Sequence, residues 1–570
     1  MKTNRTLRWL YAVPGGKKAY IAALAVLQGI DGAIGVVFAL LMRNAVDAAV
    51  ARDGSSFWRW MTAIVLLVVL MLALRAVVRR LAELSRSGFE NAFKMRLVDA
   101  LLHRDFLQVS AVHSAEWLNR LTSDAVVVAN SYVEILPGLA AMVVKLVSAL
   151  VMILVLEPRF AAILVPGGAL MIFFTWLFRR VLKRLHKNIQ EADGRLRVFL
   201  SERIGSTLMI RSFAAEDRTA VEAQEKMDEH RAARMRRNRF SNLCNIGFGA
   251  AMNGMYLLGV GWCGFGILKG TVTFGTLTAV TQLISQIQSP FANITGYLPR
   301  YYAMLASAER LMEAEDFREE AETAFPVSEM REFYHTGLSA IGLRDASFAY
   351  YPVVEQTVDL SKENMPSALE HLSLEVRKGE YVAFTGPSGC GKSTALKLLM
   401  CVYLPYSGLR YYVDKNGNEE ELTPAHRRLF AYVPQGNVLM NGTMREVVAF
   451  SEPAAAGDDA RIRRALKVVC ADGFVDELDR GIDTLLGEHG AGLSEGQMQR
   501  IAIARAVFSD APVLLLDEAT SSLDAETERK LLENLRSMTD KTVIIVTHRP
   551  AALTICDRVL QFTEHGITEA

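Results

Sequence analysis

The stretch YVAFTGPSGCGKSTALKLLM, residues 381–400, decides the fold of the second half of the chain. Its first five residues have the composition of a buried strand, and its last six, ALKLLM, that of a helix. Between them lies the pattern G-x-x-x-x-G-K-[ST], a glycine-rich loop whose backbone N–H groups wrap phosphates. Strand, loop and helix in this order favour a nucleotide site over a structural turn. The predicted nucleotide-binding residues of the loop are Gly386, Pro387, Ser388, Gly389, Cys390, Gly391, Lys392, Ser393 and Thr394.

A second apolar run ends in two carboxylates. Residues 513–516 read as a short buried strand, followed by Asp517 and Glu518. Because the carboxyl ends of parallel strands meet at one edge of a sheet, we expect these acids beside the loop, where Ser393 offers a hydroxyl to Mg²⁺. Asp517 is expected to hold Mg²⁺ and Glu518 to polarise the attacking water. Taken by itself, the sequence LLLDE could be a strand end with solvated acids. Together with the glycine-rich loop upstream, it is predicted to form the second half of a nucleotide site.

The region around these motifs alternates between two patterns. From about Ile341, short aliphatic or β-branched runs alternate with helical segments, as in LEVRKGEYVAFTG, STALKLLM, PVLLLDEAT and KTVIIVTHR. Such alternation is typical of a parallel sheet covered on both faces by helices. We therefore predict an α/β P-loop domain.

The first half of the chain is far more apolar. The chain has 570 residues, 51% of them hydrophobic, and a mean hydropathy of +0.19, which is high for a soluble protein and long enough for at least two domains. Each of six apolar runs is long enough to cross, or nearly cross, a hydrocarbon layer of ~30 Å. Six runs in series favour membrane spans over buried helices of a soluble core. The runs are residues 20–41, 61–78, 135–156, 160–178, 246–268 and 272 to about 298.

Basic residues orient these spans. Lysines and arginines before the first span and after the second and fourth predict that those ends are cytoplasmic. They are Arg8, Lys17, Lys18, Arg75, Arg79, Arg80, Arg179, Arg180, Lys183 and Arg184. The N-terminus shows no cleaved signal peptide, so the first span is the expected targeting element. The net charge of +1 excludes no class of partner, and the six cysteines lack metal-ligand spacing and are expected to be reduced thiols.

Two charged segments extend the predicted membrane domain. Residues 82–128 and 183–239 read mainly as helix on the cytoplasmic side. They are either solvated faces or continuations of the spans that contact another part of the protein. We predict an all-α transmembrane domain of six helices over residues 1–320, a linker over 321–337, and the nucleotide-binding domain over 338–570.

With these motifs in order, the chain resembles an ATP-binding-cassette (ABC) transporter half of the exporter type, over essentially its whole length. LSEGQ, residues 493–497, resembles the signature that defines the family. The resemblance implies that Tyr350 stacks on adenine, although the doubled Tyr350-Tyr351 leaves the register open by one. It also implies that Gln435 reaches Mg²⁺ and the attacking water, and that His548 contacts the γ-phosphate.

The signature implies a site shared between two chains. In this family two cassettes enclose two ATP molecules head to tail, so Ser494, Gly496 and Gln497 are expected at the nucleotide of a partner chain, and Asp524 in the loop SSLD between the two domains. One cassette per chain requires a second half-transporter, identical or different. ATP and Mg²⁺ are the implied cofactors, and no nucleic-acid partner is expected. Glu518 and His548 are both present, which predicts hydrolysis.

The resemblance also implies contacts between cassette and membrane domain. GEHG, residues 487–490, resembles an element that senses the cytoplasmic helices, with Glu488 at its acidic position. The segments SAEWLNRLTSD near Ser114 and FLSERIGSTLMIRSFAAED near Phe199 resemble coupling segments. Two positions depart from the family pattern: Glu495 replaces a glycine of the signature, and Val447 an asparagine. We expect the Glu495 side chain to turn away from the phosphate.

Polar residues within the spans are the predicted substrate contacts. They are Asp31, Lys145, Asn253, Gln282, Gln286, Asn293 and Tyr297. Asp31 and Lys145 fall near the middle of their runs and could pair, face a wet cavity, or bond neighbouring helices structurally.

Three functions fit the sequence to different degrees. The architecture favours an ATP-driven exporter of a lipid, peptide or drug-like molecule in a cell membrane, with its cassette in the cytoplasm of a bacterium. An importer on the same scaffold, such as the siderophore uptake systems that it resembles, is the alternative. The six spans argue against a soluble cassette ATPase acting on DNA or the ribosome. Since the first span starts by about residue 20, we expect no N-terminal peptidase domain and no leader-cleaving export.

Overall fold

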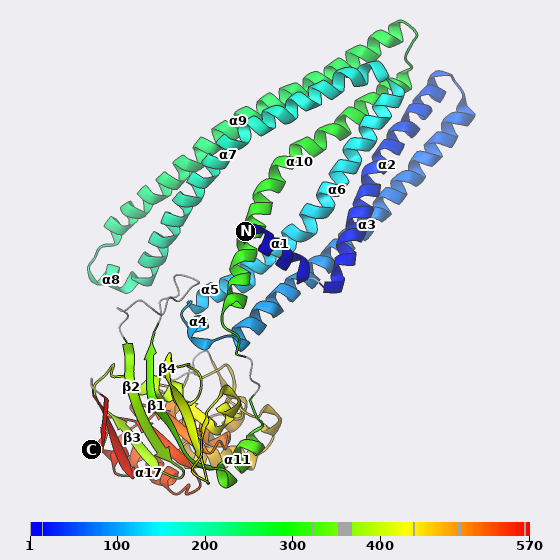
Figure 1. Ribbon diagram of the computed structural model, residues 1–570. Coiled ribbons are helices and arrows are strands. Elements are labelled where there is room, and N and C mark those ends of the chain that lie inside the picture. The colour runs from blue at the N-terminus through cyan, green and yellow to red at the C-terminus, as the bar shows by residue number, and fades with distance from the viewer. Residues whose placement is uncertain are drawn as a thin grey trace. The chain divides into compact units, whose positions relative to one another are not determined.

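The computed structural model describes residues 2–13, 15–320, 324–350, 367–436, 439–487, 492–563 and 566–569, with the side chains of 169–183 and 289–298 described in part. The chain divides into two compact units (Figure 1). The first comprises Met1–Met95 and Arg120–Met312, and the second Arg96–Asn119 and Glu313–Ala570. The predicted domain limits stay a prediction, because compact units need not coincide with domains.

Long helices build the first unit. The pairs α2 with α6, and α7 with α9, lie side by side (Figure 1). Short connections join successive helices: Arg52 in a left-handed conformation (φ 58°) between α2 and α3, and Pro158 at the first turn of α7. The elements are α1 (Lys2–Ala12), α2 (Lys18–Val50), α3 (Gly54–His103), the π-helical turn η2 (Arg120–Asp124), α6 (Ala125–Leu156), α7 (Pro158–Gly205), α8 (Thr207–Ser212), α9 (Glu216–Leu268) and α10 (Phe274–Glu313). The last turns of α3 belong to the second unit.

Among the described residues, four helical segments are long and apolar enough to cross a membrane. They are Gly15–Val50, Gly54–His103, Ser114–Leu156 and Glu216–Leu268. These contain the first, second, third and fifth predicted spans. The fourth and sixth lie in α7 and α10, which are helical throughout, and their crossing stays a prediction.

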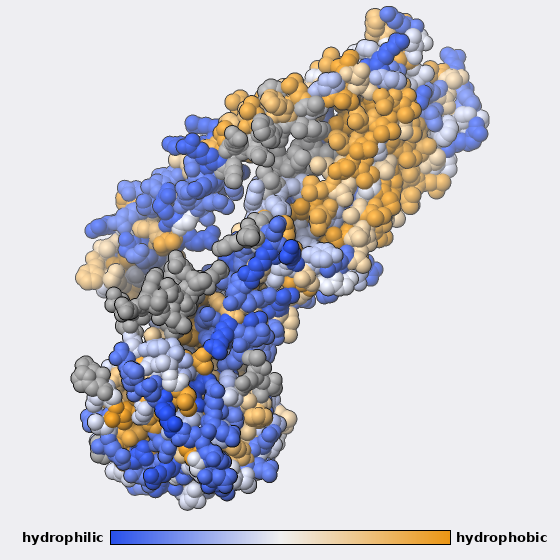
Figure 2. Space-filling model, in the orientation of Figure 1, coloured by the Kyte–Doolittle hydropathy of each residue, from blue (hydrophilic) through white to orange (hydrophobic). Residues whose placement is uncertain are grey.

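The surface of the first unit fits a lipid environment. Leu66, Val69 and Leu72 of α3 are all more than half exposed, and apolar residues gather over α2 and α3 on the face shown in Figure 2. Such a large exposed apolar surface is unusual for a soluble protein and is what hydrocarbon requires.

A buried ionic cluster joins two helices of the first unit. Asp124, at the end of η2, is 3% exposed and accepts hydrogen bonds from Arg310 Nε at 2.7 Å and from Ser307 Oγ at 2.8 Å. Arg120, also buried, donates to the Arg310 backbone oxygen at 3.0 Å. Because a buried carboxylate is costly unless it is paired and hydrogen-bonded, this cluster fixes α10 against the start of α6.

Among the described residues, the second unit contains two large sheets and one small sheet of two strands. A four-stranded antiparallel sheet has the order β2-β1-β4-β5, and a six-stranded sheet the order β12-β11-β3-β10-β9-β6, parallel except for β12. β7 and β8 pair separately. The strands are β1 (Leu338–Ala349), β2 (Ser367–Arg377), β3 (Tyr381–Thr385), β4 (Ser407–Asp414), β5 (Glu419–Glu421), β6 (Phe430–Val433), β7 (Gly442–Thr443), β8 (Leu485–Leu486), β9 (Val513–Asp517), β10 (Thr542–Val546), β11 (Arg558–Thr563) and β12 (Gly566–Glu569).

The parallel sheet separates two hydrophobic cores. Leu514 and Leu516 of β9 enter one core, whereas Val513 and Leu515 enter the other. Both faces are thus buried, which explains why this strand reads as an uninterrupted apolar run. The predicted fold class, an all-α membrane domain followed by an α/β P-loop domain, is confirmed. The helices of this unit are α4 (Phe106–Ser110), α5 (Ser114–Asn119), α11 (Val327–Thr336), α12 (Lys392–Leu399), α13 (Met444–Val448), α14 (Asp459–Val468), α15 (Asp472–Asp476), α16 (Glu495–Phe508), α17 (Ala525–Arg536) and α18 (Pro550–Leu553).

The segment predicted as a linker carries ordered structure. Met330 and Tyr334 of α11 are buried in the core of the second unit, and the Tyr334 hydroxyl is 2.9 Å from Thr542 Oγ1 of β10. Irregular acidic composition around this helix gave no sign of these contacts, because they depend on residues some 200 positions away.

The ionic cluster yields a prediction on stability. Replacing Arg310→Met leaves the buried Asp124 without its cation. Removing one partner of a buried pair costs about 3–5 kcal/mol, and we expect about 3 kcal/mol, the lower end, because the Arg310 side chain is 43% exposed. At ~2 °C per kcal/mol, the unfolding midpoint in detergent should fall by about 6 °C. The matched control is Arg300→Met, which removes an exposed partner of Glu134 and should cost less than about 1 kcal/mol. Equal midpoints for the two variants would contradict a structural role for the cluster.

Candidate nucleotide site

The phosphate-binding loop follows β3 and requires glycine at two positions. Gly386 has φ 128°, and a Cβ there would lie 2.3 Å from the Phe562 backbone oxygen. Gly391 has φ 92°, and its Cβ would lie 2.3 Å from Leu369 Cδ2. Both positive φ angles and the lack of space exclude other residues, so the loop conformation is fixed by these two glycines.

The Lys392 side chain hydrogen-bonds to the backbone of its own loop. Its side chain is 5% exposed, and Nζ donates to the backbone oxygens of Gly386 and Pro387, each at 2.7 Å. Cys390 Sγ lies 3.7 Å from the same Nζ. Phosphate oxygens would be stronger acceptors for this ammonium than the two carbonyls, because they carry negative charge and the carbonyl oxygens are neutral.

The first carboxylate of β9 is buried against the loop helix. Asp517 is 1% exposed; Ser393 Oγ donates to its Oδ1 at 2.9 Å, and Tyr432 Oη donates to its Oδ2 at 2.9 Å. Burial, followed by the adjacent Asp517 charge, raises the pKa of Tyr432, so its hydroxyl stays protonated as a donor. Sequence reasoning missed Tyr432; the available signal was a hydroxyl in an apolar strand three residues before Gln435.

The second carboxylate, Glu518, is hydrogen-bonded to Gln435, the glutamine that follows β6. Gln435 Nε2 donates to Glu518 Oε2 at 2.7 Å. Glu518 has φ 51°, a left-handed conformation uncommon outside glycine, and its backbone N–H donates to Val546 of β10 at 3.1 Å. His548, exposed, follows the same strand. The carboxyl ends of β6, β9 and β10 therefore bring Gln435, Asp517, Glu518 and His548 to one edge of the sheet, as ligand sites in open α/β sheets require.

The donor set suits magnesium. A hydroxyl (Ser393), two carboxylates and an amide oxygen are hard oxygen ligands of the kind that Mg²⁺ binds, with phosphates completing its shell. Ser393, Gln435 and Asp517 would hold the ion. Within the described ranges there is no cluster of three or more His, Cys, Asp or Glu side chains that could hold a metal ion.

Tyr350 lies beside the loop helix in an aromatic cluster. Its hydroxyl is 2.9 Å from Thr394 Oγ1, and its ring packs edge-on against Phe348 at 5.1 Å and Tyr403 at 5.8 Å. Burial raises the pKa of Tyr403 to about 12. Tyr351, the other possible register, lies outside the described residues. Stacking of Tyr350 on adenine stays a prediction.

The signature forms the first turn of α16. Ser494 caps this helix in a reciprocal capping box: Ser494 Oγ accepts from the Gln497 backbone N–H at 3.3 Å, and Gln497 Oε1 accepts from the Ser494 N–H at 2.8 Å. A Cβ on Gly496 would lie 2.9 Å from the Ser522 backbone oxygen. Glu495 is exposed at the positive end of the helix, where a carboxylate is favourable. Glu488 lies outside the described residues.

The loop SSLD is fixed by two side chains that sequence reasoning did not identify. Gln499 of α16 donates to Ser521 Oγ and accepts from the Ser522 N–H, both at 3.0 Å. Arg549 donates to the backbone oxygens of Ser521 and Leu523, and to buried Glu528, each at 2.8 Å. No local pattern signals such long-range bonds.

Asp524, at the end of this loop, has a structural role in the described chain. It caps α17 by accepting from the Thr527 N–H at 2.9 Å, and this hydrogen bond lowers the pKa of Asp524. A cap leaves one of its oxygens for other partners, so the predicted contact with nucleotide stays a prediction.

The first predicted coupling segment, near Ser114, is divided between the two units: Ser114–Asn119 belong to the second and Arg120–Asp124 to the first. The helix α4, which precedes this segment, packs within the second unit. The Phe106 ring of α4 lies 6.1 Å from that of Tyr403, and Leu107 packs against the hydrophobic core. A cavity of about 520 Å³ is lined by Arg104 and Phe106, which precede this segment, and by Tyr432 of the site. Its further lining residues are Leu101, Leu102, Glu320, Ser393, Lys397, Met400, Val402, Arg427, Pro434, Gln435 and Asp517.

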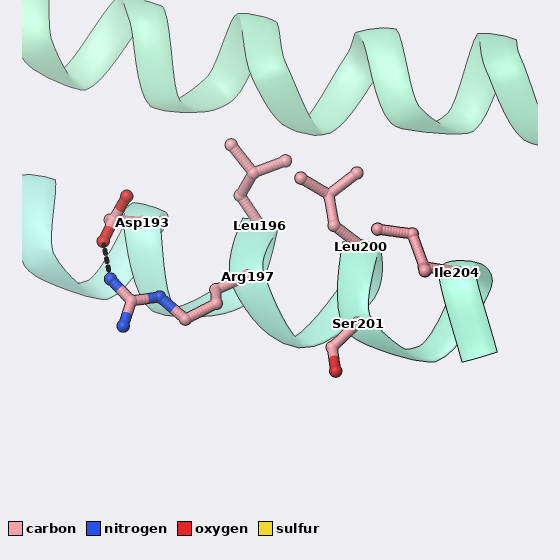
Figure 3. A pocket seen from close by; sticks show the side chains of 6 residues that line it. All are labelled: Asp193, Leu196, Arg197, Leu200, Ser201 and Ile204. Atoms are coloured by element: carbon pink, nitrogen blue, oxygen red, sulfur yellow. Dashed lines mark hydrogen bonds and ion pairs between the residues drawn. The ribbon is translucent and has the colours of Figure 1, made fainter. Parts of the chain in front are cut away.

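The second predicted coupling segment belongs to the first unit and exposes apolar side chains. Leu208 of α8 and the neighbouring Ile204 and Phe213 are each more than 70% exposed. On α7, Leu196, Leu200 and Ile204 line up on one side of a hollow of about 500 Å³, while Arg197 pairs with Asp193 at 3.2 Å (Figure 3). The remaining lining residue is Ser201.

The predicted substrate residues are brought together in part. Asp31 pairs with Arg75 of α3 at 3.2 Å, a partner that sequence reasoning did not assign to it. Lys145 lies next to this pair, since a Cβ on Gly32 would be 3.2 Å from Lys145 Cβ. Gln286 Nε2 donates to the Gly35 backbone oxygen of α2 at 2.6 Å.

The other predicted substrate residues are more scattered. Asn253 is exposed on α9, Gln282 is half-buried on α10, and Tyr297 packs over Gly138 of α6. The Asn293 side chain lies outside the described residues. Contact with substrate stays a prediction for all of them.

Comparison with protein families matches both halves of the chain. Residues 20–291 match the family described as the ABC transporter transmembrane region, and residues 369–521 the family described as ABC transporter. The first matched region contains most of the long apolar helices, and the second contains the glycine loop, Gln435, the signature and both carboxylates of the site.

Individual relatives match over part of their length. An ATP-dependent lipid A-core flippase of Desulfotalea psychrophila is 30% identical over 69% of this chain and 65% of its own. The uncharacterized ABC transporter ATP-binding protein YfiC of Bacillus subtilis is 27% identical over 78% and 71%, respectively. The leukotoxin translocation ATP-binding protein LktB of Mannheimia glucosida is 32% identical over 53% and 40%. The chain thus spans between two fifths and about seven tenths of these relatives.

A solved structure shares the whole fold. A bacterial Atm1-family ABC exporter with ATP bound superposes with a TM-score of 0.77 over 97% of this chain and 94% of that one, at 22% identity. At this identity the similarity concerns the fold.

The exposed position of Glu495 yields a prediction. We expect Glu495→Gly to change ATP turnover by less than tenfold, because its side chain is exposed at the first turn of α16 and neither caps the helix nor takes part in the capping box. The matched control is Gly496→Ala, whose Cβ would meet the Ser522 backbone oxygen at 2.9 Å and should reduce turnover far more. Phosphate release by the purified chain measures both. A change above tenfold for Glu495→Gly would indicate that this side chain acts on the nucleotide.

Proposed function

The chain belongs to the ABC transporter family, and from this we propose that it is an ATP-driven exporter that couples ATP hydrolysis in a dimer to reorientation of its membrane helices. The observation that carries the proposal is the convergence of Gln435, Asp517, Glu518 and His548 beside the loop of Lys392, in a chain whose other unit is built of membrane-crossing helices. A binding module without turnover would not need the second carboxylate.

Each side chain of the site has a task in hydrolysis. Lys392 exchanges its two loop carbonyls for phosphate oxygens when ATP binds. Glu518, held by Gln435, accepts a hydrogen bond from the attacking water and polarises it. His548 donates to the γ-phosphate. Ser393, Asp517 and Gln435 would hold Mg²⁺, which would supply positive charge to neutralise the phosphates.

A second chain completes the site. Ser494 and Glu495 are exposed, so the N-terminus of α16 is open to an anion brought by another molecule. Exposed apolar residues of α8 provide a surface for packing on a partner. The intact pair Glu518 and His548 suits a homodimer and equally the competent half of a heterodimer.

Export is favoured over import by the relatives. Their names describe a flippase for lipid A-core and a protein for leukotoxin translocation, and the solved structure is described as an exporter. We place the protein in a bacterial inner membrane with the second unit in the cytoplasm. An importer on the same scaffold is the alternative, and the transported molecule is a lipid, peptide or drug-like compound.

Glu518→Gln tests hydrolysis and transport together. Removing a positioned general base lowers rates by about 10²–10⁴-fold. We expect phosphate release to fall at least 100-fold while ATP still binds, and ATP-dependent flux into inverted membrane vesicles to disappear. Glu526→Gln is the matched control, since Glu526 pairs with Lys530 at the surface of α17.

The outcomes separate the functions. Uptake by inverted vesicles supports export, whereas loss of preloaded substrate supports import. Turnover by Glu518→Gln within tenfold of wild type would contradict the assigned chemistry.

Lys145→Met tests the predicted substrate site. Lys145 lies next to the Asp31–Arg75 pair in the membrane unit, and ionisable residues there usually serve binding or structure. We expect transport to fall at least fivefold with basal ATP hydrolysis unchanged. Lys94→Met is the control, because Lys94 pairs with Glu90 within the same helix, α3. Wild-type transport by Lys145→Met would remove this residue from the substrate site.

A further inference from the structure

Asp517 is a buried carboxylate with a donor on each oxygen. Ser393 Oγ donates a hydrogen bond to Oδ1 and Tyr432 Oη donates one to Oδ2, both at 2.9 Å. Asp517 is only 1% exposed. The bond from Ser393 belongs to the phosphate-binding loop. The hydrogen bond from Tyr432 comes from a neighbouring strand, β6. No step of the proposed hydrolysis uses the Tyr432 hydroxyl.

The backbone fixes Tyr432 in this position. β6 and β9 pair in parallel, with Tyr432 opposite Leu515, two residues before Asp517. The ring packs partly buried against the hydrophobic core, so its hydroxyl is carried to the carboxylate by a rigid strand rather than by a loop. Three residues later the same strand end delivers Gln435 to Glu518 at 2.7 Å. The two adjacent acids at the end of β9 are thus each held by a side chain in, or directly after, β6.

We propose that Tyr432 is a positioning residue for the metal-binding carboxylate: its hydroxyl holds Asp517 Oδ2 and so keeps Oδ1 beside Ser393, where Mg²⁺ would be held. The inference rests on the proposed ATPase function. Tyr432 touches neither nucleotide nor metal in this role and acts through Asp517.

The expected effect follows from how such partners act. Hydrogen-bond partners of metal ligands orient them, and their removal typically costs 10–100-fold in metal affinity or activity. Without the Tyr432 hydroxyl, Oδ2 of a buried carboxylate loses its neutral donor, and Asp517 is free to turn from Ser393. Metal affinity should suffer, while nucleotide binding through the loop should not.

The experiment measures metal binding without turnover. Full-length wild type, Tyr432→Phe and Tyr432→Leu are purified in detergent with the non-hydrolysable analogue adenylyl imidodiphosphate, and Mn²⁺ is titrated as the probe with free ion read by electron paramagnetic resonance. We expect both variants to bind Mn²⁺ about 10-fold more weakly. Binding of the analogue in EDTA should stay within twofold of wild type, which also shows that the variants fold.

A matched variant controls for loss of any buried tyrosine hydroxyl. Tyr411 of β4 is 5% exposed, and its hydroxyl donates to Glu375 Oε2 at 3.1 Å, away from Asp517. Tyr411→Phe should bind Mn²⁺ as wild type does. Equal weakening by Tyr411→Phe and Tyr432→Phe would assign the effect to general destabilisation and overturn the inference.

The remaining outcomes are equally decisive. Mn²⁺ affinity within twofold of wild type in Tyr432→Phe overturns the proposal, and so does weakening in Tyr432→Leu alone, because ring packing would then be responsible. A wild-type chain that binds Mn²⁺ and the analogue but does not turn over ATP contradicts the proposed function and not this inference. A wild-type chain that hydrolyses ATP, with Tyr432→Phe binding Mn²⁺ normally, contradicts the inference alone.

Discussion

The burial of one negative charge, Asp517, is the constraint on which the second unit depends. A carboxylate at 1% exposure is tolerated only where donors satisfy it, and its two donors come from separate elements, Ser393 from α12 and Tyr432 from β6. The phosphate-binding loop, β9 and β6 must therefore be in register for the carboxylate to be stable. The hydrogen bonds that stabilise the buried charge of Asp517 are therefore the same contacts that bring the loop, β9 and β6 together at the candidate nucleotide site.

The turn after Asp517 separates the tasks of two adjacent acids. Glu518 leaves the strand in a left-handed conformation (φ 51°) that its backbone bond to Val546 maintains. Asp517 consequently stays inside, against Ser393, whereas Glu518 faces Gln435. Strain of this kind persists only where surrounding bonds enforce it, and it is common at functional sites. The pair thus offers one acid for a metal and one for water.

Local patterns in the sequence predicted much of this architecture, and long-range contacts explain what they missed. The strands of the parallel sheet and the glycine loop both follow from short-range rules of burial and backbone conformation. Tyr432 reads as an ordinary strand residue, and the pairing of Asp31 with Arg75 joins positions 44 apart. The placement of residues 96–119 with the second unit likewise depends on contacts such as Phe106 with Tyr403, which composition does not encode.

The capping geometry explains how the signature can meet a phosphate despite Glu495. In the capping box the Ser494 oxygen accepts from the Gln497 N–H, which leaves its hydroxyl proton to donate. Gln497 uses its oxygen on the Ser494 N–H, which leaves its amide nitrogen as a donor. Both polar side chains are therefore held with donors available, at a helix end whose remaining N–H groups and dipole favour an anion. Glu495 adds a negative charge between these side chains without removing a donor. The capping box, and not the glycine that Glu495 replaces, therefore keeps the donors of Ser494 and Gln497 in place, as the proposed contact with a phosphate requires.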